Sequence, residues 1–127
     1  MSGSDSGQRL ARADRLRSRA DYLRCYRQGR RQAGPLFNLH THDNALDHPR
    51  LGITASRKVG KAVVRGLLKR RVREVFRRSE LRTSLGGLDL VVHLQPAAAR
   101  AGFAELKLEL DRSLSRAVAR RQSRSRP

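Results

Sequence analysis

Acidic residues are scarce in this sequence: 11 Asp and Glu stand against 29 Lys and Arg, so the formal net charge is +18 over 127 residues. Lysine is scarce as well, because only Lys58, Lys61, Lys69 and Lys107 are not arginine among the basic residues. Repulsion among so many like charges does not stabilise a fold, so the excess points to a polyanionic partner. The planar guanidinium of arginine can bind a phosphate through two hydrogen bonds and can stack on bases.

Long apolar runs are missing, and none approaches the roughly 18 residues of a membrane span. The Ser- and Gly-rich start of the chain, Met1 to Gln8, has no hydrophobic segment, which argues against a secretory signal. The lone Cys25 cannot form an internal disulfide, and this is typical of a reducing cytosol. We therefore expect a cytoplasmic protein without a membrane partner.

Groupings typical of a catalytic site are also lacking. His40 and His42 share one face of a predicted strand, but no cluster of cysteines or carboxylates accompanies them to complete a zinc site. Ser56 has no base near it in sequence, and no phosphate-binding glycine-rich loop is present. His93 lies in an apolar strand and is interpreted as a structural histidine. We expect no catalytic residue and no metal bound by the polypeptide alone.

Hydrophobic periodicity predicts three helices and three strands. Ser18 is the expected N-cap of a helix that ends near Gln28, with Gly29 as its stop. Alternation predicts strands over 36–42 and 50–55, which we expect to form an antiparallel hairpin, and a third over 88–94. Helices are predicted over 61–78 and over a last amphipathic segment, in which Phe103, Leu106, Leu110, Leu114 and Val118 recur at helical spacing.

These elements, in the order α-β-β-α-β-α, predict a two-layer α+β sandwich with helices packed on a small sheet. We expect a flexible basic arm over residues 1–15, one folded domain over 16–119 and a disordered Arg/Ser-rich tail over 120–127.

The segment 57–78 carries most of the functional signal, with ten basic side chains and one acid, Glu74. Within it, five basic residues recur at every fourth position: Lys61, Arg65, Lys69, Arg73 and Arg77. An apolar stripe lies to one side of this row and consists of Val64, Leu68, Val72 and Val75. A row of one sign repels itself in isolation, so we expect it to follow an RNA backbone while the stripe docks on the sheet. Contact with about five phosphates would make the logarithm of the binding constant fall against the logarithm of the salt concentration with a slope of roughly −3.5 to −4.5.

A helix that lies on a membrane surface is an alternative for this segment. It would need Trp or Phe anchors, and Phe76 is the one aromatic residue here.

The stretch Arg50–Glu74, RLGITASRKVGKAVVRGLLKRRVRE, resembles the signature of the bacterial ribonuclease P protein subunit. The family pattern is Gly-x-Ser/Thr-x-Ser, then Lys/Arg-Lys-x-Gly-x-Ala-Val-x-Arg-Asn-x-x-Lys-Arg-x-x-Arg. The helix with Tyr22 and Tyr26 is similar to the family's first helix, and the resemblance covers residues 14–118. The family's central Arg-Asn-Arg is Arg65-Gly66-Leu67 here, so we assign no site role to Gly66 or Leu67.

The resemblance implies a ribonucleoprotein that removes the 5′ leader from precursor tRNA, in which the RNA subunit holds the catalytic Mg²⁺. It implies one protein per catalytic RNA, and a left-handed β-α-β crossover that the sequence pattern cannot reveal.

The resemblance also implies two sets of binding residues. The residues expected to bind the catalytic RNA are Lys61, Arg65, Lys69, Arg70, Arg73 and Arg77. A leader-binding cleft between the first helix and the sheet is expected to contain Tyr22, Tyr26, His40, Arg57 and Lys58. Stacking combined with cations is how proteins hold single strands without reading their sequence. The alternative is a structural RNA-binding protein, such as a ribosomal protein or an assembly factor.

Overall fold

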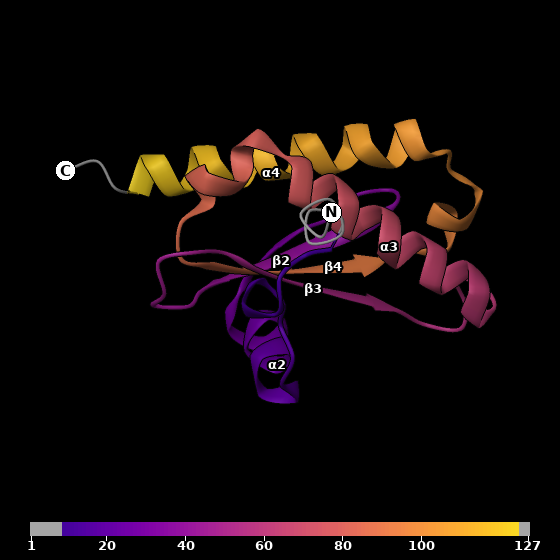
Figure 1. The fold of residues 1–127 in the computed structure, drawn as a ribbon, viewed down its shortest axis with the longest axis horizontal. Coiled ribbons are helices and arrows are strands. Elements are labelled where there is room, and N and C mark those ends of the chain that lie inside the picture. Colours follow the sequence, from indigo (N-terminus) through magenta and orange to yellow (C-terminus); the bar gives the residue numbers. More distant parts are fainter. Residues whose placement is uncertain (1–8, 125–127) are drawn as a thin grey trace, which may run out of the picture.

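The computed structural model describes residues 9–124 of the chain. Within these residues, three α-helices and four strands form an α+β fold, and short 3₁₀ turns connect them (Figure 1). The elements are η1 (Arg12–Asp14), α2 (Arg19–Gln28), β1 (Arg30–Gln32), β2 (Phe37–Asp43), β3 (Arg50–Ala55), α3 (Ala62–Arg78), η2 (Glu80–Leu85), β4 (Leu88–Leu94), η3 (Pro96–Arg100) and α4 (Phe103–Arg124). The predicted helices and long strands are confirmed, and β1 is an additional short strand at the sheet edge.

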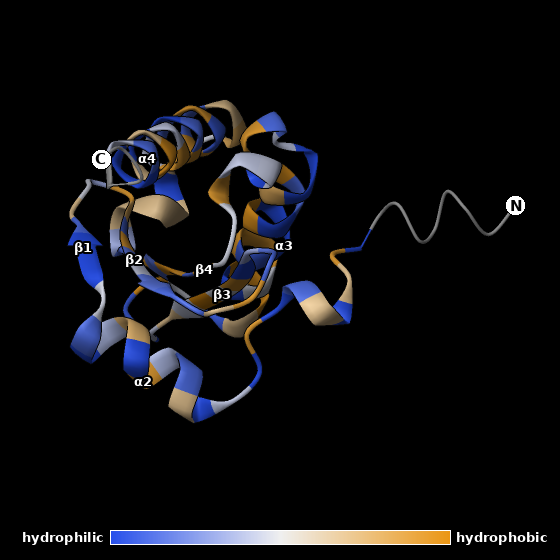
Figure 2. Ribbon diagram, turned by 90° about the vertical axis from the view of Figure 1, so that its left-hand side faces the viewer, coloured by the Kyte–Doolittle hydropathy of each residue, from blue (hydrophilic) through white to orange (hydrophobic). Residues whose placement is uncertain are grey.

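The strands form one mixed sheet in the order β1-β2-β4-β3. β4 is antiparallel to β2 and parallel to β3. The predicted hairpin of β2 and β3 is wrong, because β4 lies between these two strands. Figure 1 shows that β3 and β4 run in the same direction, and in Figure 2 both strands run away from the viewer. In Figure 2 the chain leaves β3, passes through α3 above the sheet, and enters β4 to the left of β3. The β3-α3-β4 crossover is therefore left-handed, whereas nearly all such crossovers in proteins are right-handed.

The two faces of the sheet differ in chemistry. α3 and α4 cover one face, and α2 lies across the other (Figure 2). Alternation within the strands sends Phe37, Leu39, Ile53, Leu90, Val92 and Leu94 to the α3–α4 side, where they form the main core with Leu68, Val72 and Phe76 of α3. From α4, Leu106, Leu110, Leu114 and Val118 join this core, whereas Phe103 at the start of the helix is 43% exposed.

The α2 side of the sheet is polar by the same alternation. It carries His40 on β2, Thr54 on β3 and His93 on β4, together with the Arg50–Asp89 ion pair, in which the nitrogen and oxygen lie 2.8 Å apart. α2 covers part of this face and buries Cys25 against Val91. The folding pattern therefore leaves one polar sheet surface, partly covered by a helix, away from the main core.

The ends of the described chain are more ordered than the sequence predicted. Leu10 is 3% exposed and belongs to the main core, and the η1 turn follows it, so residues 9–15 are not a loose arm. α4 continues to Arg124, so residues 120–124 are helical and not disordered. The remainder of the predicted arm and tail, residues 1–8 and 125–127, lies outside the described residues.

α2 begins and ends for identifiable reasons. The Ser18 side chain accepts a hydrogen bond from the Asp21 backbone N–H at 3.1 Å, as expected of an N-cap. The helix ends at Gly29, whose φ is −84°, so a left-handed conformation is not the reason for glycine here. A Cβ at Gly29 would lie 2.4 Å from the carbonyl oxygens of Cys25 and Thr41. Glycine is needed because β2 passes close to the end of the helix, which fixes α2 against the sheet.

Candidate nucleic-acid interface

Tyr22 of α2 lies directly on β3. Its ring occupies the space that a side chain at position 52 would take, since a Cβ on Gly52 would lie 2.6 Å from the ring. Burial raises the pKa of Tyr22, so the phenol stays neutral at physiological pH. Gly52 is therefore part of the site: its lack of a side chain allows the aromatic ring to seat on the sheet.

Tyr26 is held one turn further along α2 by a polar network. Its hydroxyl lies 2.6 Å from Thr54 Oγ1, and Thr54 Oγ1 lies 2.7 Å from His93 Nδ1. The Tyr26 ring meets the His40 ring edge to face, with centroids 4.6 Å apart. Burial, followed by the charges of His93 and Arg31, lowers the pKa of His40, so its imidazole is neutral at pH 7. Three of the five predicted cleft residues, Tyr22, Tyr26 and His40, are thus brought together.

The mouth of this cleft is a hollow of about 440 Å³ beside α2 and β3. Besides Tyr22, Tyr26 and Thr54, its walls include Arg17 and Arg19, which sequence reasoning missed. A signal was available, because these two arginines flank the predicted N-cap, Ser18, at a helix end that attracts anions.

Arg57 and Lys58, the other two predicted cleft residues, do not line this hollow. They are exposed in the turn after β3, which is closed by a hydrogen bond from the Val59 N–H to the Ser56 carbonyl oxygen at 3.0 Å. They lie at the end of the strand that carries Thr54, on the connection that leads into α3.

The basic row on α3 is displayed unevenly. Lys61 is the N-cap residue and is exposed, as is Arg70, whereas the other predicted contacts, Arg65, Lys69, Arg73 and Arg77, are half-buried. Arg65 Nε donates to the Gly60 carbonyl oxygen at 3.1 Å, and Arg77 pairs with Glu74 at 2.6 Å. Part of the row is therefore held by the protein, while Lys61 at the start of the helix and Arg70 face solvent.

Arg73 connects the helix to the cleft. Its positive charge acts on Tyr22, where it opposes the effect of burial on the tyrosine pKa. Burial, and then the charge of Arg15, lower the pKa of Arg73 itself. Arg73 also lines a second hollow, of about 370 Å³, with Arg9, Arg15 and Arg70. The α3 row and the cleft are thus neighbouring parts of one basic surface, joined at Arg73.

Within residues 9–124, no three His, Cys, Asp or Glu side chains gather where they could hold a metal ion. No helix in that part of the chain is long and apolar enough to cross a membrane.

A small basic domain with aromatic side chains in a polar cleft and a cationic helix beside it has the features of a protein that binds single-stranded nucleic acid. Comparison with known proteins specifies the family. The model of the Ribonuclease P family matches residues 10–118, and the chain belongs to this family.

Individual relatives agree with this placement. The Ribonuclease P protein component of Acidothermus cellulolyticus is 40% identical over 104 residues, covering 80% of this chain and 86% of that protein. The RNase P protein of Thermotoga maritima, solved with 1-(4-fluorophenyl)-2-thiourea, is 36% identical with a TM-score of 0.73, over 80% of this chain and 98% of that one. A mutant RNase P protein of Staphylococcus aureus is 33% identical with a TM-score of 0.76, over 83% and 88%.

Proposed function

We propose that this chain is the protein component of ribonuclease P. It binds the catalytic RNA and the 5′ leader of precursor tRNA, and so assists the endonucleolytic cut that produces the mature tRNA 5′ end. The observation that carries the proposal is the constellation of Tyr22, Tyr26 and His40 on the polar sheet face, next to Arg73 of the basic helix.

The two parts of the basic surface have separate tasks in this proposal. The exposed cations of α3, chiefly Lys61 and Arg70, with Arg65, Lys69, Arg73 and Arg77 beside them, neutralise phosphates of the catalytic RNA. The leader passes between α2 and the sheet, where a base stacks on Tyr22 or Tyr26 and Arg17 and Arg19 contact its phosphates. Arg57 and Lys58 extend the cationic path from the end of β3 towards α3.

The polypeptide contributes binding and positioning. Mature tRNA has no leader whose bases could stack on the tyrosines. Stacking therefore makes the protein favour precursor tRNA over mature tRNA without reading a base sequence. The chemistry of phosphodiester hydrolysis is supplied by Mg²⁺ held by the RNA subunit. The protein's cations lower the repulsion between the two RNAs and so reduce the Mg²⁺ needed for assembly. We propose a complex of one protein with one catalytic RNA, in the cytoplasm.

The decisive experiment adds the purified full-length protein to the cognate catalytic RNA at low Mg²⁺ and follows cleavage of precursor tRNA. We expect strong stimulation, with product carrying a 5′-phosphate. A structural RNA-binding protein of another particle would give no stimulation at any protein concentration, and that result would overturn the proposal.

A further inference from the structure

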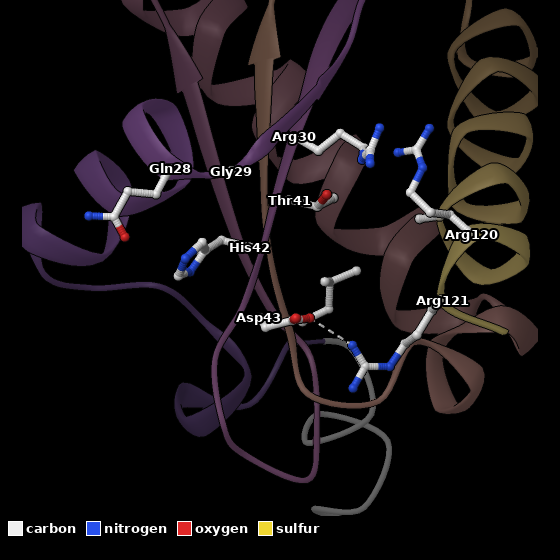
Figure 3. A pocket seen from close by; sticks show the side chains of 10 residues that line it. Gln28, Gly29, Arg30, Thr41, His42, Asp43, Arg120 and Arg121 are labelled. Atoms are coloured by element: carbon white, nitrogen blue, oxygen red, sulfur yellow. Dashed lines mark hydrogen bonds and ion pairs between the residues drawn. The ribbon is translucent and has the colours of Figure 1, made fainter. Parts of the chain in front are cut away.

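A hollow of about 520 Å³ lies at the β1 edge of the sheet (Figure 3). β1 and β3 are the two opposite edges of the sheet, and α3 packs near β3. The hollow is bounded by the end of α2, the end of β2 and the last turns of α4. It shares no lining residue with the hollow beside Tyr22 or with the one beside Arg73.

Two arginines that are 90 positions apart in the sequence converge there. Arg30 extends from β1 and Arg120 from α4, and Figure 3 shows their guanidinium groups pointing toward one another. The charge of Arg30, added to the effect of burial, lowers the pKa of Arg120. Arg120 is half-buried and Arg30 is exposed at the rim of the hollow, so two like charges lie near each other and one of them is partly shielded from water.

Arg120 is also short of a partner. Its Nη1 atom is buried and has no hydrogen-bond acceptor within residues 9–124. Buried polar groups in native proteins are nearly always hydrogen-bonded, and buried charges are nearly always paired. The arrangement therefore leaves an acceptor to be supplied from outside the described protein.

The protein's own needs do not account for this arrangement. The last turns of α2 and α4 meet here and helix C-terminal ends attract cations, but this attraction gives the buried Nη1 of Arg120 no acceptor within residues 9–124. Arg121 illustrates an arginine used structurally, because its Nη1 donates to Asp43 Oδ1 at 3.0 Å. Arg120 differs, since its buried nitrogen donates to no carbonyl or carboxylate of the described chain.

We propose that Arg30 and Arg120 form a phosphate-binding site, in which one oxyanion lies between the two guanidinium groups. Guanidinium groups bind tetrahedral oxyanions through paired, charge-assisted hydrogen bonds, and an anion here would remove the repulsion between the two cations. The buried hydroxyl-bearing residue Thr41 forms part of the wall. A backbone phosphate of RNA and a free inorganic phosphate present the same chemistry to this site. The inference does not depend on the roles proposed for α3 and the cleft.

The first test is a phosphate titration of the full-length protein at constant ionic strength, followed by the melting midpoint. The variant carries Arg30→Gln and Arg120→Gln, and the control carries Arg112→Gln, an exposed arginine of α4 outside the hollow. We expect the phosphate-dependent rise in midpoint to be at least halved in the variant and unchanged in the control. Without phosphate, Arg120→Gln should be at least as stable as the parent protein, because it removes an uncompensated charge. Equal phosphate dependence in all proteins would overturn the proposal.

A second measurement needs no variant. Inorganic phosphate added to the unaltered protein should shift the backbone amide signals of Gly29 and Ala117, which line the hollow, at lower concentration than those of Arg112. Absence of such a shift would also overturn the site.

The source of the phosphate is resolved by RNA binding. If the site takes a phosphate of the catalytic RNA or of precursor tRNA, the Arg30→Gln and Arg120→Gln variant should show a salt slope smaller by roughly 0.7–0.9 with that RNA. If the site takes free phosphate, the slope should stay unchanged while the phosphate effect on melting is lost. Both results support an oxyanion site, and they identify its ligand.

Discussion

The cleft under α2 and the basic row of α3 are neighbours, yet they are built in opposite ways. In the cleft each functional ring has a fixed seat: Tyr22 on Gly52, and Tyr26 bonded to Thr54 and touching His40. On α3 the cations repel one another, and Glu74 is the one acid of the helix. A site with fixed side chains loses little entropy on binding and favours shape and stacking. A row of like charges contributes a field that is sensitive to salt.

The largest expected effect comes from removing exposed or half-exposed charge from α3. Replacing Lys61, Lys69 and Arg70 with Gln should weaken binding of the catalytic RNA on the order of a hundredfold near ~0.1 M salt, with a salt slope smaller by roughly 2–3. Filter binding across a salt series measures both quantities. The matched control replaces the exposed Arg100, Arg112 and Arg116, which changes the net charge equally away from α3. An equal loss in the control would show that net charge, and not the helix, determines binding.

A side chain added at position 52, where the Tyr22 ring packs on β3, should disturb the cleft and leave the α3 row unchanged. A methyl group at Gly52 would lie 2.6 Å from the ring, so Gly52→Ala must displace Tyr22. We expect a loss of about 1–3 kcal/mol in the free energy of unfolding, as for other overpacked sites. Binding of precursor tRNA by the assembled enzyme should weaken, and binding of the catalytic RNA should not. Unchanged precursor binding would contradict the seat assigned to Tyr22.

A glycine-to-alanine change on α3 should stabilise the protein, in contrast to Gly52→Ala on β3. A Cβ at Gly66 has no neighbour within 4 Å, so Gly66→Ala adds helix propensity without a clash. We expect the protein to gain about 0.5–1 kcal/mol in the free energy of unfolding, measured by urea denaturation. A loss of stability would mean that the helix near Gly66 is not regular.

The smallest expected effect is the pH dependence carried by His40. Burial lowers its folded-state pKa below the value of 6.5 for an ordinary histidine. Below that value the unfolded chain binds a proton that the folded chain does not, so the free energy of unfolding falls as the pH drops. His40→Gln should therefore lose less stability than the parent protein between about pH 7.5 and 5.5. His48, whose pKa is raised mainly by its hydrogen bond to Asp47, acts with the opposite sign but is common to both proteins. An identical pH dependence in the two proteins would contradict this assignment.

Local pattern was enough to predict the elements, but not how they pair. The alternation in 88–94 predicted β4 within its observed bounds, because side chains alternate wherever a strand has two different faces. The position of β4 between β2 and β3 depends on contacts distant in sequence, and a strand's own pattern does not encode its neighbours. β1 was missed because Arg30, Arg31 and Gln32 carry no apolar alternation. It forms against the edge of β2, where backbone groups are available for pairing.

The part of the site that depends on residues close together in the sequence could be predicted, and the part that depends on distant residues could not. Tyr22 and Tyr26 are one helical turn apart, so their common orientation follows from the sequence. The bond from Tyr26 to Thr54, and the like-charged pair of Arg30 and Arg120, join residues far apart along the chain. The row on α3 was predicted as a uniform ridge. The pairing of Arg77 with Glu74 follows from their spacing of three residues in a helix, whereas the bond from Arg65 to the Gly60 carbonyl oxygen depends on how the chain enters the helix.

The central claim is that the cleft binds the leader and α3 does not. It is tested most directly by replacing Tyr22 and Tyr26 with Ala and measuring the affinity of the assembled enzyme for precursor and for mature tRNA. The lost stacking, at roughly 1–3 kcal/mol per base, should weaken precursor binding about fivefold to a hundredfold and leave mature tRNA unaffected. Equal weakening for both RNAs would contradict the account.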